Sequence, residues 1–476
     1  MEKENKLLNA DVKFGLKSFI TICSILVVIM VIVGVLTFVV PAGEYRTDEN
    51  GNIIQNSFSF IQSQTRLPVY RWFTAPIEAL ILGSGNFNII QIIAVLLVLG
   101  GTFKVLNVSG GLYAVVQIIV NKFYFKRYQL IWCITLVMML LSSCFGLQEE
   151  LLILFPIFLS FAQAMKWSKI QAISLILITT GVGFTIALFN PFTIGVASDM
   201  VSGGGVTVLD GLWYRAILFC ILYVFTSLYL CWRARQDEKK NFNLEQTEFV
   251  ELTDKEKEEH LKKSKMITTL FLSVLAVIVV ASIVPAIADL GIGMVLMAIT
   301  FIVGTFIIGK KTLGSIKSTL KVFLSGAKDL SPSIVIILLA FSVKYIAENG
   351  NILHTLFYYC HAFLSGQSPY IAVVILYILI LVFEFFIPGS LAKVLVLIPL
   401  LTIAPIPGIS VNIILLAFLF GDGYANVLYP TCGTLVVGLS LADVSYVEWL
   451  KKTGLFQIAL FILSVLFLML AVFIGL

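Results

Sequence analysis

Long apolar runs separated by short polar breaks fill most of this sequence. Many runs reach about 20 residues, the length that a helix needs to cross a lipid bilayer. A backbone that crosses hydrocarbon must satisfy its own hydrogen bonds, so each run is predicted to be an α-helix. The predicted helices lie near 18–40, 88–106, 128–142, 148–165, 170–202, 212–232, 266–287, 291–309, 332–348, 369–385, 391–404, 410–447 and 453–475.

Composition supports this interpretation. Of the 476 residues, 59% are hydrophobic and only 12% are charged. Because a soluble enzyme has about 25% charged residues, this class is excluded, and an all-α polytopic membrane protein is predicted. The seven cysteines lie almost all within apolar runs and have no paired spacing, so no disulfide framework or cysteine metal site is expected.

The basic residues indicate which breaks face the cytoplasm, because lysine and arginine favour cytoplasmic loops. Most of the 32 lysine and arginine residues lie in alternate breaks, which are 3–17, 122–127, 166–169, 233–265, 310–328 and 451–452. Complementary segments such as 41–87 and 349–368 are predicted to be outer loops. The N-terminus is therefore predicted to be cytoplasmic, and the C-terminus is predicted to lie outside.

Two segments are predicted to be re-entrant hairpins. Residues 128–165 begin and end beside cytoplasmic lysines, and neither half makes a comfortable span, so a turn is expected near Ser142–Gly146. By the same reasoning, 369–404 enters from outside and turns near Pro388–Ser390. Re-entrant backbone is tolerated only where it is buried in protein or lines a cavity, so the two hairpins indicate a transport pathway.

The two halves of the chain repeat the same order with opposite sidedness. Without the hairpins, about nine full spans remain. Gly146 precedes Pro156 by ten positions, and Gly389 precedes Pro399 by ten. The predicted divisions are a first inverted repeat (1–232), a charged cytoplasmic linker with a connecting helix (233–290) and a second inverted repeat (291–476).

The long span after each hairpin is predicted to be interrupted. Each contains a glycine pair followed by an internal proline, namely Gly181, Gly183 and Pro191 in the first half and Gly421, Gly423 and Pro430 in the second. Proline removes a backbone hydrogen bond and glycine permits a turn. Interrupted spans at matching places in two halves indicate the substrate and ion sites of a secondary transporter.

A set of short motifs occurs in order along the chain: Val40–Tyr45, Gly146–Glu150, Asn190–Phe192, Pro388–Ser390, Gly421–Gly423 and Pro430–Gly433. Together they resemble the YfcC branch of the dicarboxylate anaerobic carrier family, which includes arginine/ornithine-antiporter-like members. The resemblance implies the ion transporter superfamily, which also holds AbgT and divalent anion:sodium symporters. Such proteins are typically homodimers with a scaffold and a moving transport domain that holds both hairpins. Relatives often continue Pro-Ser-Gly-Ser-Gly-Gln-Ala, whereas this chain continues from Pro388 to Lys393 as Pro-Gly-Ser-Leu-Ala-Lys.

Polar residues at the hairpin tips and interrupted helices are the candidate ligands. Carbonyl, Ser, Thr and Asn oxygens can coordinate sodium, and helix N-termini favour a carboxylate. The ion-coupling candidates are Ser142, Ser143, Asn190, Thr193, Asp422 and Asn426. The substrate-binding candidates are Glu149, Glu150, Asn190, Gly389, Ser390, Lys393, Asn426 and Thr431. The alternative is that the small polar residues only help helices to pack and share hydrogen bonds.

Charged residues at membrane depth are the sharper signal, because each costs roughly 2.5–3.5 kcal/mol on insertion scales unless it is paired or solvated. Glu149 or Glu150 could attract a cationic amino group, carry a coupling proton or cap a helix. Asp422 is interpreted as an ion or proton site. Lys393 could neutralise a substrate carboxylate, or it could pair with Asp422 or Glu384 and serve structure only.

Three further features concern helix surfaces and the charged loop. Lys344 and Glu348 are predicted to form an intrahelical pair because they are four residues apart. The lysines of 310–328 alternate with apolar residues, which suits a helix at the cytoplasmic interface. The loop 233–265 contains as many acidic as basic residues, which indicates a solvated linker rather than a nucleic-acid surface.

The predicted function is secondary active transport of a small carboxylate-bearing metabolite, most simply a basic amino acid, across the cytoplasmic membrane. The alternatives are a dicarboxylate or peptide-like carboxylate transporter coupled to sodium or protons, or an ion channel. The spans contain no arrangement typical of an enzyme. No cofactor is expected beyond a coupling Na+ or H+, and the expected partners are the substrate, membrane lipid and a second copy of the chain.

Overall fold

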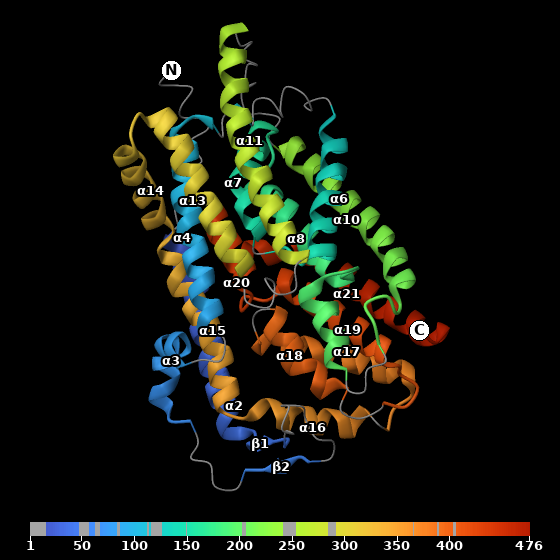
Figure 1. The fold of residues 1–476 in the computed structure, drawn as a ribbon. Helices are drawn as coiled ribbons and strands as arrows, with labels where there is room; N and C mark the ends of the chain where they lie inside the picture. Colours follow the sequence, from blue (N-terminus) through green and yellow to red (C-terminus); the bar gives the residue numbers. More distant parts are fainter. Residues whose placement is uncertain are drawn as a thin grey trace.

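The protein is almost entirely helical (Figure 1). The structure, a computed structural model, describes residues 16–46, 57–61, 67–82, 86–111, 114–115, 126–148, 150–201, 206–240, 254–283, 292–364, 366–387, 390–402 and 406–476. In this part of the chain, 7 helices are long and apolar enough to cross a membrane, or up to 8 if one bent pair is a single span. A multi-pass membrane protein is therefore supported, and the number of about nine spans stays a prediction.

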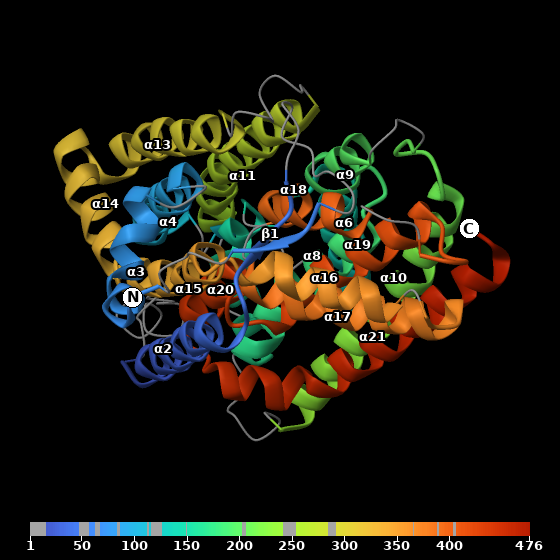
Figure 2. The same cartoon turned by 90° about the horizontal axis from the view of Figure 1, so that it is seen from below.

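The helices form two groups that lie side by side in Figures 1 and 2. The first group contains α2 (Leu16–Val39), α3 (Val69–Leu82), α4 (Asn86–Val108), α11 (Asp254–Ile283), α13 (Ile292–Leu313), α14 (Ile316–Leu330) and α15 (Pro332–Asn349). Within it, α4 packs against α13 and α14, and α15 packs against α2 and α3. A Cβ at Gly326 in α14 would lie 2.2 Å from the carbonyl oxygen of Gly100 in α4, so these two glycines allow the two backbones to approach closely.

The second group contains α6 (Arg127–Phe145), η2 (Glu150–Leu154), α7 (Phe155–Ala164), α8 (Lys169–Ile186), the π-helical turn η3 (Pro191–Gly195), α9 (Val196–Met200), α10 (Leu212–Lys240), α17 (Pro369–Phe386), α18 (Ser390–Leu401), α19 (Val411–Leu428), α20 (Gly433–Ala442) and α21 (Tyr446–Ile474). At its centre α8 packs against α19. Helices α6, α7 and α10 pack against α8, while α17 and α21 pack against α19. We call residues 187–190 the first break and residues 429–432 the second break.

Two predicted outer loops contain helices. Helix α3 lies within 41–87, and α16 (Ile352–Leu364) lies within 349–368. Figure 1 shows α16 lying across the lower end of the helices, beside the antiparallel strands β1 (Gly43–Glu44) and β2 (Ser59–Phe60). The sequence did not predict these two helices, because both are too short to be recognised as membrane-spanning runs, and the location of the two segments on the outer side stays a prediction.

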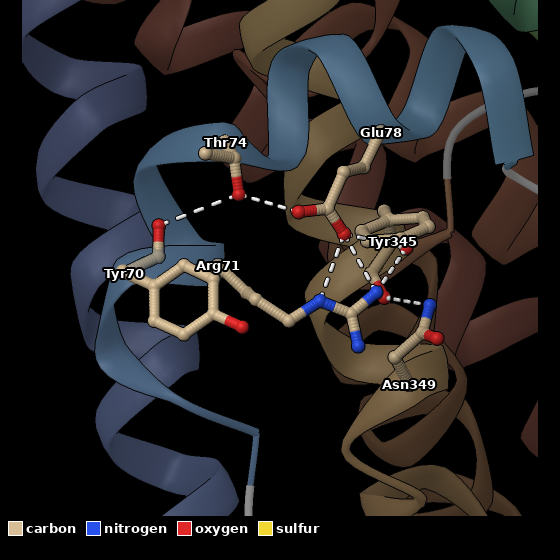
Figure 3. Close-up of polar contacts among 6 residues, drawn as sticks. All are labelled: Tyr70, Arg71, Thr74, Glu78, Tyr345 and Asn349. Carbon is tan, nitrogen blue, oxygen red and sulfur yellow. Dashed lines mark hydrogen bonds and ion pairs between the residues drawn. The ribbon is translucent and has the colours of Figure 1, made fainter.

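A polar cluster attaches α3 to α15 (Figure 3). The Arg71 guanidinium donates from Nε and Nη2 to Glu78 Oε2, at 2.8 and 2.6 Å. The Tyr345 hydroxyl on α15 donates to the same carboxylate oxygen at 2.8 Å. The hydrogen bond from Arg71 lowers the pKa of Glu78, so the carboxylate that holds the cluster together is the ionised form.

The hairpin turns are only partly defined. Helix α6 ends at Phe145, and Gly146 takes the left-handed conformation with φ of 69°, so the first turn lies where it was predicted. Pro388 and Gly389, at the second turn, lie outside the described residues. The entering arms α6 and α17 have 19 and 18 residues and are long and apolar enough to cross a membrane, so the re-entrant character of both hairpins stays a prediction.

The predicted charged linker is shorter than 233–265. Helix α10 continues to Lys240, and α11 begins at Asp254, so charged residues at both ends of the predicted loop extend the helices. The pairing of Lys344 with Glu348 is confirmed at 3.4 Å. Residues 316–330 form helix α14, and its location at the membrane interface stays a prediction.

Candidate functional site

The two interrupted spans begin and end in the same way. The hydroxyls of Ser168 and Ser410 each accept a hydrogen bond from the backbone N–H three residues later, which begins α8 and α19. Helix α8 ends at Ile186, and the break that follows it runs up to Pro191, whereas α19 ends at Leu428, two residues before Pro430. Proline disfavours the helical conformation in the residue before it, which agrees with the end of α19. Helix α8 ends earlier, where Ala187 takes the left-handed conformation with φ of 40°. The predicted interruptions are confirmed.

The glycines that were expected to permit these turns lie within the helices instead. A Cβ at Gly183 in α8 would lie 1.8 Å from Ser142 Oγ on α6. A Cβ at Gly423 in α19 would lie 2.6 Å from the carbonyl oxygen of Gly181 in α8. Small residues let helix backbones approach closely. The glycines therefore determine how closely α6, α8 and α19 pack, and both breaks begin after them.

The first break is held by α6 and α10. The backbone N–H of Leu188 donates to Ser143 Oγ at 2.9 Å, and that of Phe189 donates to the Ser143 carbonyl at 3.1 Å. The buried guanidinium of Arg215 on α10 donates to the Ala187 carbonyl at 2.5 Å and to carbonyls just before α10. The exposed carbonyls at a helix C-terminus carry partial negative charge, which favours a cation there. Ser143 and Arg215 thus stabilise the interruption itself.

The second break is held by α21 in an equivalent way. Trp449 Nε1 donates to the Val427 carbonyl at 3.0 Å, and the Tyr446 hydroxyl donates to the Leu428 carbonyl at 2.7 Å. In both halves the helix that follows the interrupted span thus satisfies the carbonyls of the break. The donors differ, because the first break has a cationic donor and the second has neutral ones.

A buried charged cluster lies beside the second break. Lys393 on α18 contacts Glu384 on α17 with Nζ and Oε2 2.5 Å apart, and Asp422 on α19 with Nζ and Oδ1 2.8 Å apart. The same ammonium lies 3.4 Å from Asn426 Oδ1, one turn further along α19. Lys393, Glu384 and Asp422 have side-chain exposures of 2%, 0% and 0%. We call these four residues the lysine cluster.

The lysine cluster holds more negative than positive charge when all its groups are ionised. Two carboxylates face one ammonium, and Glu384 Oε1 accepts no hydrogen bond within the described residues. Burying an uncompensated charge costs several kcal/mol, so such a cluster favours an additional cation or a proton. Of the two hypotheses for Lys393, the pairing with Asp422 and Glu384 is present, and a direct contact with substrate stays a prediction.

The other candidates are placed as follows. Ser142, Ser143, Asn190, Thr193, Asn426 and Thr431 are buried. Thr193 Oγ1, in η3, has no hydrogen-bond partner in the described part of the chain. Helix α18 contacts η3 and α9, so the first break and the lysine cluster are on adjoining elements. Glu149 and Gly389, and the side chains of Glu150 and Ser390, lie outside the described residues.

Sequence reasoning missed Arg215 and left Glu384 ambiguous. Arg215 follows a Trp-Tyr pair at the start of a span, which resembles an interfacial anchor rather than a buried group. Glu384 is an isolated acid in an apolar run, so the cost of burying charge was a sufficient signal for it. Among the described residues, no group of three or more His, Cys, Asp or Glu is placed to hold a metal ion.

Comparisons with known proteins are consistent with membrane transport. At 24% identity, the chain resembles the putative basic amino acid antiporter YfcC of Escherichia coli over 92% of this chain and 93% of that protein. An uncharacterized protein of Haemophilus influenzae is 23% identical over 77% of this chain and 72% of its own length.

Two solved transporters align with the structure. The YdaH transporter of Alcanivorax borkumensis has a TM-score of 0.44 and 15% identity, over 96% of this chain and 98% of its own. MtrF of Neisseria gonorrhoeae, described among antimetabolite efflux pumps, has a TM-score of 0.41 and 14% identity, over 95% of each chain.

The family comparison confirms the resemblance found in the sequence. The model of the C4-dicarboxylate anaerobic carrier family matches residues 19–473, nearly the whole chain. The chain therefore belongs to the C4-dicarboxylate anaerobic carrier family and is a membrane transport protein rather than an enzyme.

Proposed function

We propose that the protein is a secondary active transporter that exchanges cationic amino acids, such as arginine and ornithine, by alternating access. The observation that carries this proposal is the lysine cluster, where two buried carboxylates face one ammonium. A cationic side chain or amino group that reaches Glu384 Oε1 would compensate the remaining negative charge. An anionic substrate would increase the charge imbalance.

The second break also offers a place for the carboxylate of an amino acid. Helix α20 begins at Gly433, directly after this break. The backbone N–H groups at a helix N-terminus favour a carboxylate. A cationic amino acid would thus find a partner for each charged end on either side of one break.

The names of the relative and of the family suggest two different substrate classes. The Escherichia coli relative is named as a putative basic amino acid antiporter, which agrees with the proposal. The family description names C4-dicarboxylates, which would need cationic partners. Lys393 already contacts two carboxylates, and Arg215 is bound by backbone carbonyls, so these two buried cations are less suited to a dianion.

Counterflow in proteoliposomes tests the proposal. Vesicles loaded with ornithine are expected to accumulate radiolabelled arginine, and external glutamate or succinate should not compete. Glu384→Gln is expected to reduce arginine uptake by about tenfold or more, the equivalent of about 1.4 kcal/mol. Glu348→Gln, which alters the ion pair with Lys344 on α15, is the matched control and should retain most of the uptake. Exchange of succinate without exchange of arginine would contradict the proposal.

For the assembly, we propose a homodimer in the cytoplasmic membrane with a cytoplasmic N-terminus and an outer C-terminus. The first helix group would be the scaffold and the second the moving transport domain, with the two inverted repeats contributing to both. The test is the accessibility of a C-terminal tag to protease added outside right-side-out vesicles. Cleavage only in inside-out vesicles would contradict the orientation.

A further inference from the structure

We infer that the Lys393 ammonium is a tethered cation that occupies the place of a bound monovalent metal ion at the second break, so that no sodium ion binds there. The inference concerns the driving ion and holds whichever substrate the protein carries. It rests on the contacts of the ammonium, on the charge of the groups around it and on the different residues at the corresponding positions in the first half of the sequence.

The surroundings of the ammonium resemble the shell of a hard cation. Its contacts are oxygen atoms of Glu384, Asp422 and Asn426, at 2.5, 2.8 and 3.4 Å. Carboxylate and amide oxygens are the ligands that hard metal cations prefer, and an ammonium, which only donates hydrogen bonds, can use the same ligands. The three oxygens come from α17 and α19, whereas the cation comes from α18.

The charges explain why some cation must be present. Without Lys393, two buried carboxylates would lose the positive charge that both of them contact, which is strongly unfavourable. The lysine supplies this charge covalently. A sodium ion would have to enter and leave in each transport cycle, whereas the ammonium stays with α18.

The first half of the sequence has no such cluster. With the hairpins aligned on Gly146 and Gly389, Leu141 and Glu150 stand at the positions of Glu384 and Lys393. With the interrupted spans aligned on their glycine pairs, Val182 and Ile186 correspond to Asp422 and Asn426. The two halves therefore differ at the positions of the lysine cluster: the Lys393 ammonium contacts carboxylates, whereas the Arg215 guanidinium at the first break donates to backbone carbonyls.

The test is the effect of sodium on thermal unfolding of the purified full-length protein, measured in sodium chloride and in choline chloride at equal ionic strength. Lys393→Met should unmask the oxygen shell and gain a sodium-dependent rise of roughly 2–5 °C over any rise in wild type, as expected for saturation well above the dissociation constant. Lys344→Met, which removes another buried lysine with an acidic partner, should behave as wild type. Adding Asp422→Asn to Lys393→Met should abolish the gain.

Equal sodium dependence of wild type and Lys393→Met would overturn the inference. If Lys393→Met cannot be purified, the double variant Lys393→Met/Glu384→Gln carries the test, because its cluster has the same net charge as wild type. It should gain the sodium-dependent rise that wild type lacks, and a missing rise would overturn the inference. Because unfolding needs no substrate, failure of arginine exchange would refute the proposed function and leave this result unaffected.

Discussion

The energetic coupling between Lys393 and Asp422 is a stringent test of the lysine cluster. Lys393→Met removes the cation shared by two buried carboxylates, so it is expected to lower the free energy of unfolding by about 3–5 kcal/mol. Asp422→Asn replaces the carboxylate whose Oδ1 lies 2.8 Å from the ammonium with a neutral amide, and it leaves the ammonium with Glu384 at 2.5 Å. Its cost is therefore expected to be smaller, about 1.5–3 kcal/mol for one hydrogen bond between charged groups.

The double variant distinguishes a shared cluster from independent effects. In Lys393→Met/Asp422→Asn only one carboxylate remains buried, so the repulsion that destabilises Lys393→Met is absent. The double variant is expected to be no less stable than Lys393→Met, which gives a coupling energy of at least about 1.5 kcal/mol. Unfolding in detergent and choline chloride, followed by tryptophan fluorescence, measures the four stabilities.

The pair Lys344 and Glu348 provides the control cycle. These residues are four apart on α15, and Nζ and Oε1 are 3.4 Å apart. Glu348 is 24% exposed, so the coupling is expected to be at most about 0.5 kcal/mol. If the effects of Lys393→Met and Asp422→Asn add within about 0.5 kcal/mol, the reasoning about a shared cluster is refuted.

Three further predictions concern the first break, the helix crossing and the α3 cluster. Arg215→Met removes the donor to the Ala187 carbonyl and should lower the free energy of unfolding by about 1.5–3 kcal/mol in unfolding assays. Gly183→Ala places a methyl group 1.8 Å from a hydroxyl of α6, and this overpacking should lower the free energy of unfolding by about 1–3 kcal/mol. The unfolding temperature and the transport rate should both fall. The hydrogen bond from Arg71 lowers the pKa of Glu78 below its ordinary value of 4.5. The ionised Glu78 therefore stabilises the folded protein above pH 4.5, and this stabilisation is lost as the pH falls through the lowered pKa. Glu78→Gln should therefore remove acid sensitivity of unfolding in this range, and an unchanged pH profile would contradict the assignment.

The interrupted helices were predictable because a backbone in lipid must be helical, and both long spans contain a glycine pair followed by an internal proline. Proline provides no backbone N–H for a helix, and the first break ends directly before Pro191, whereas the second break contains Pro430. Proline alone does not determine where a helix is interrupted, because Pro76 and Pro399 lie inside α3 and α18. The role of the glycines was not predictable from one span alone. Gly183 and Gly423 are defined by the neighbouring helices they touch, which depends on tertiary packing.

The sequence identified unusual charged residues at membrane depth, but it did not determine which of them pair. The cost of burial identified Asp422 and Lys393 as unusual, and a lysine at this depth has few ways to be stabilised. Which of Asp422 and Glu384 would pair with Lys393 depended on how α17, α18 and α19 come together. The structure brings both carboxylates to one ammonium. Arg215 was missed because its partners are backbone carbonyls, which no residue pattern reveals.

The most direct test of the central claim is the charge preference of exchange in a single preparation. Uptake of radiolabelled arginine is measured into proteoliposomes loaded with ornithine or with succinate, for wild type and for Asp422→Asn. The account predicts accumulation only in ornithine-loaded vesicles, with a loss of about tenfold or more in Asp422→Asn. Equal accumulation in succinate-loaded vesicles, or an unchanged rate in Asp422→Asn, would contradict it.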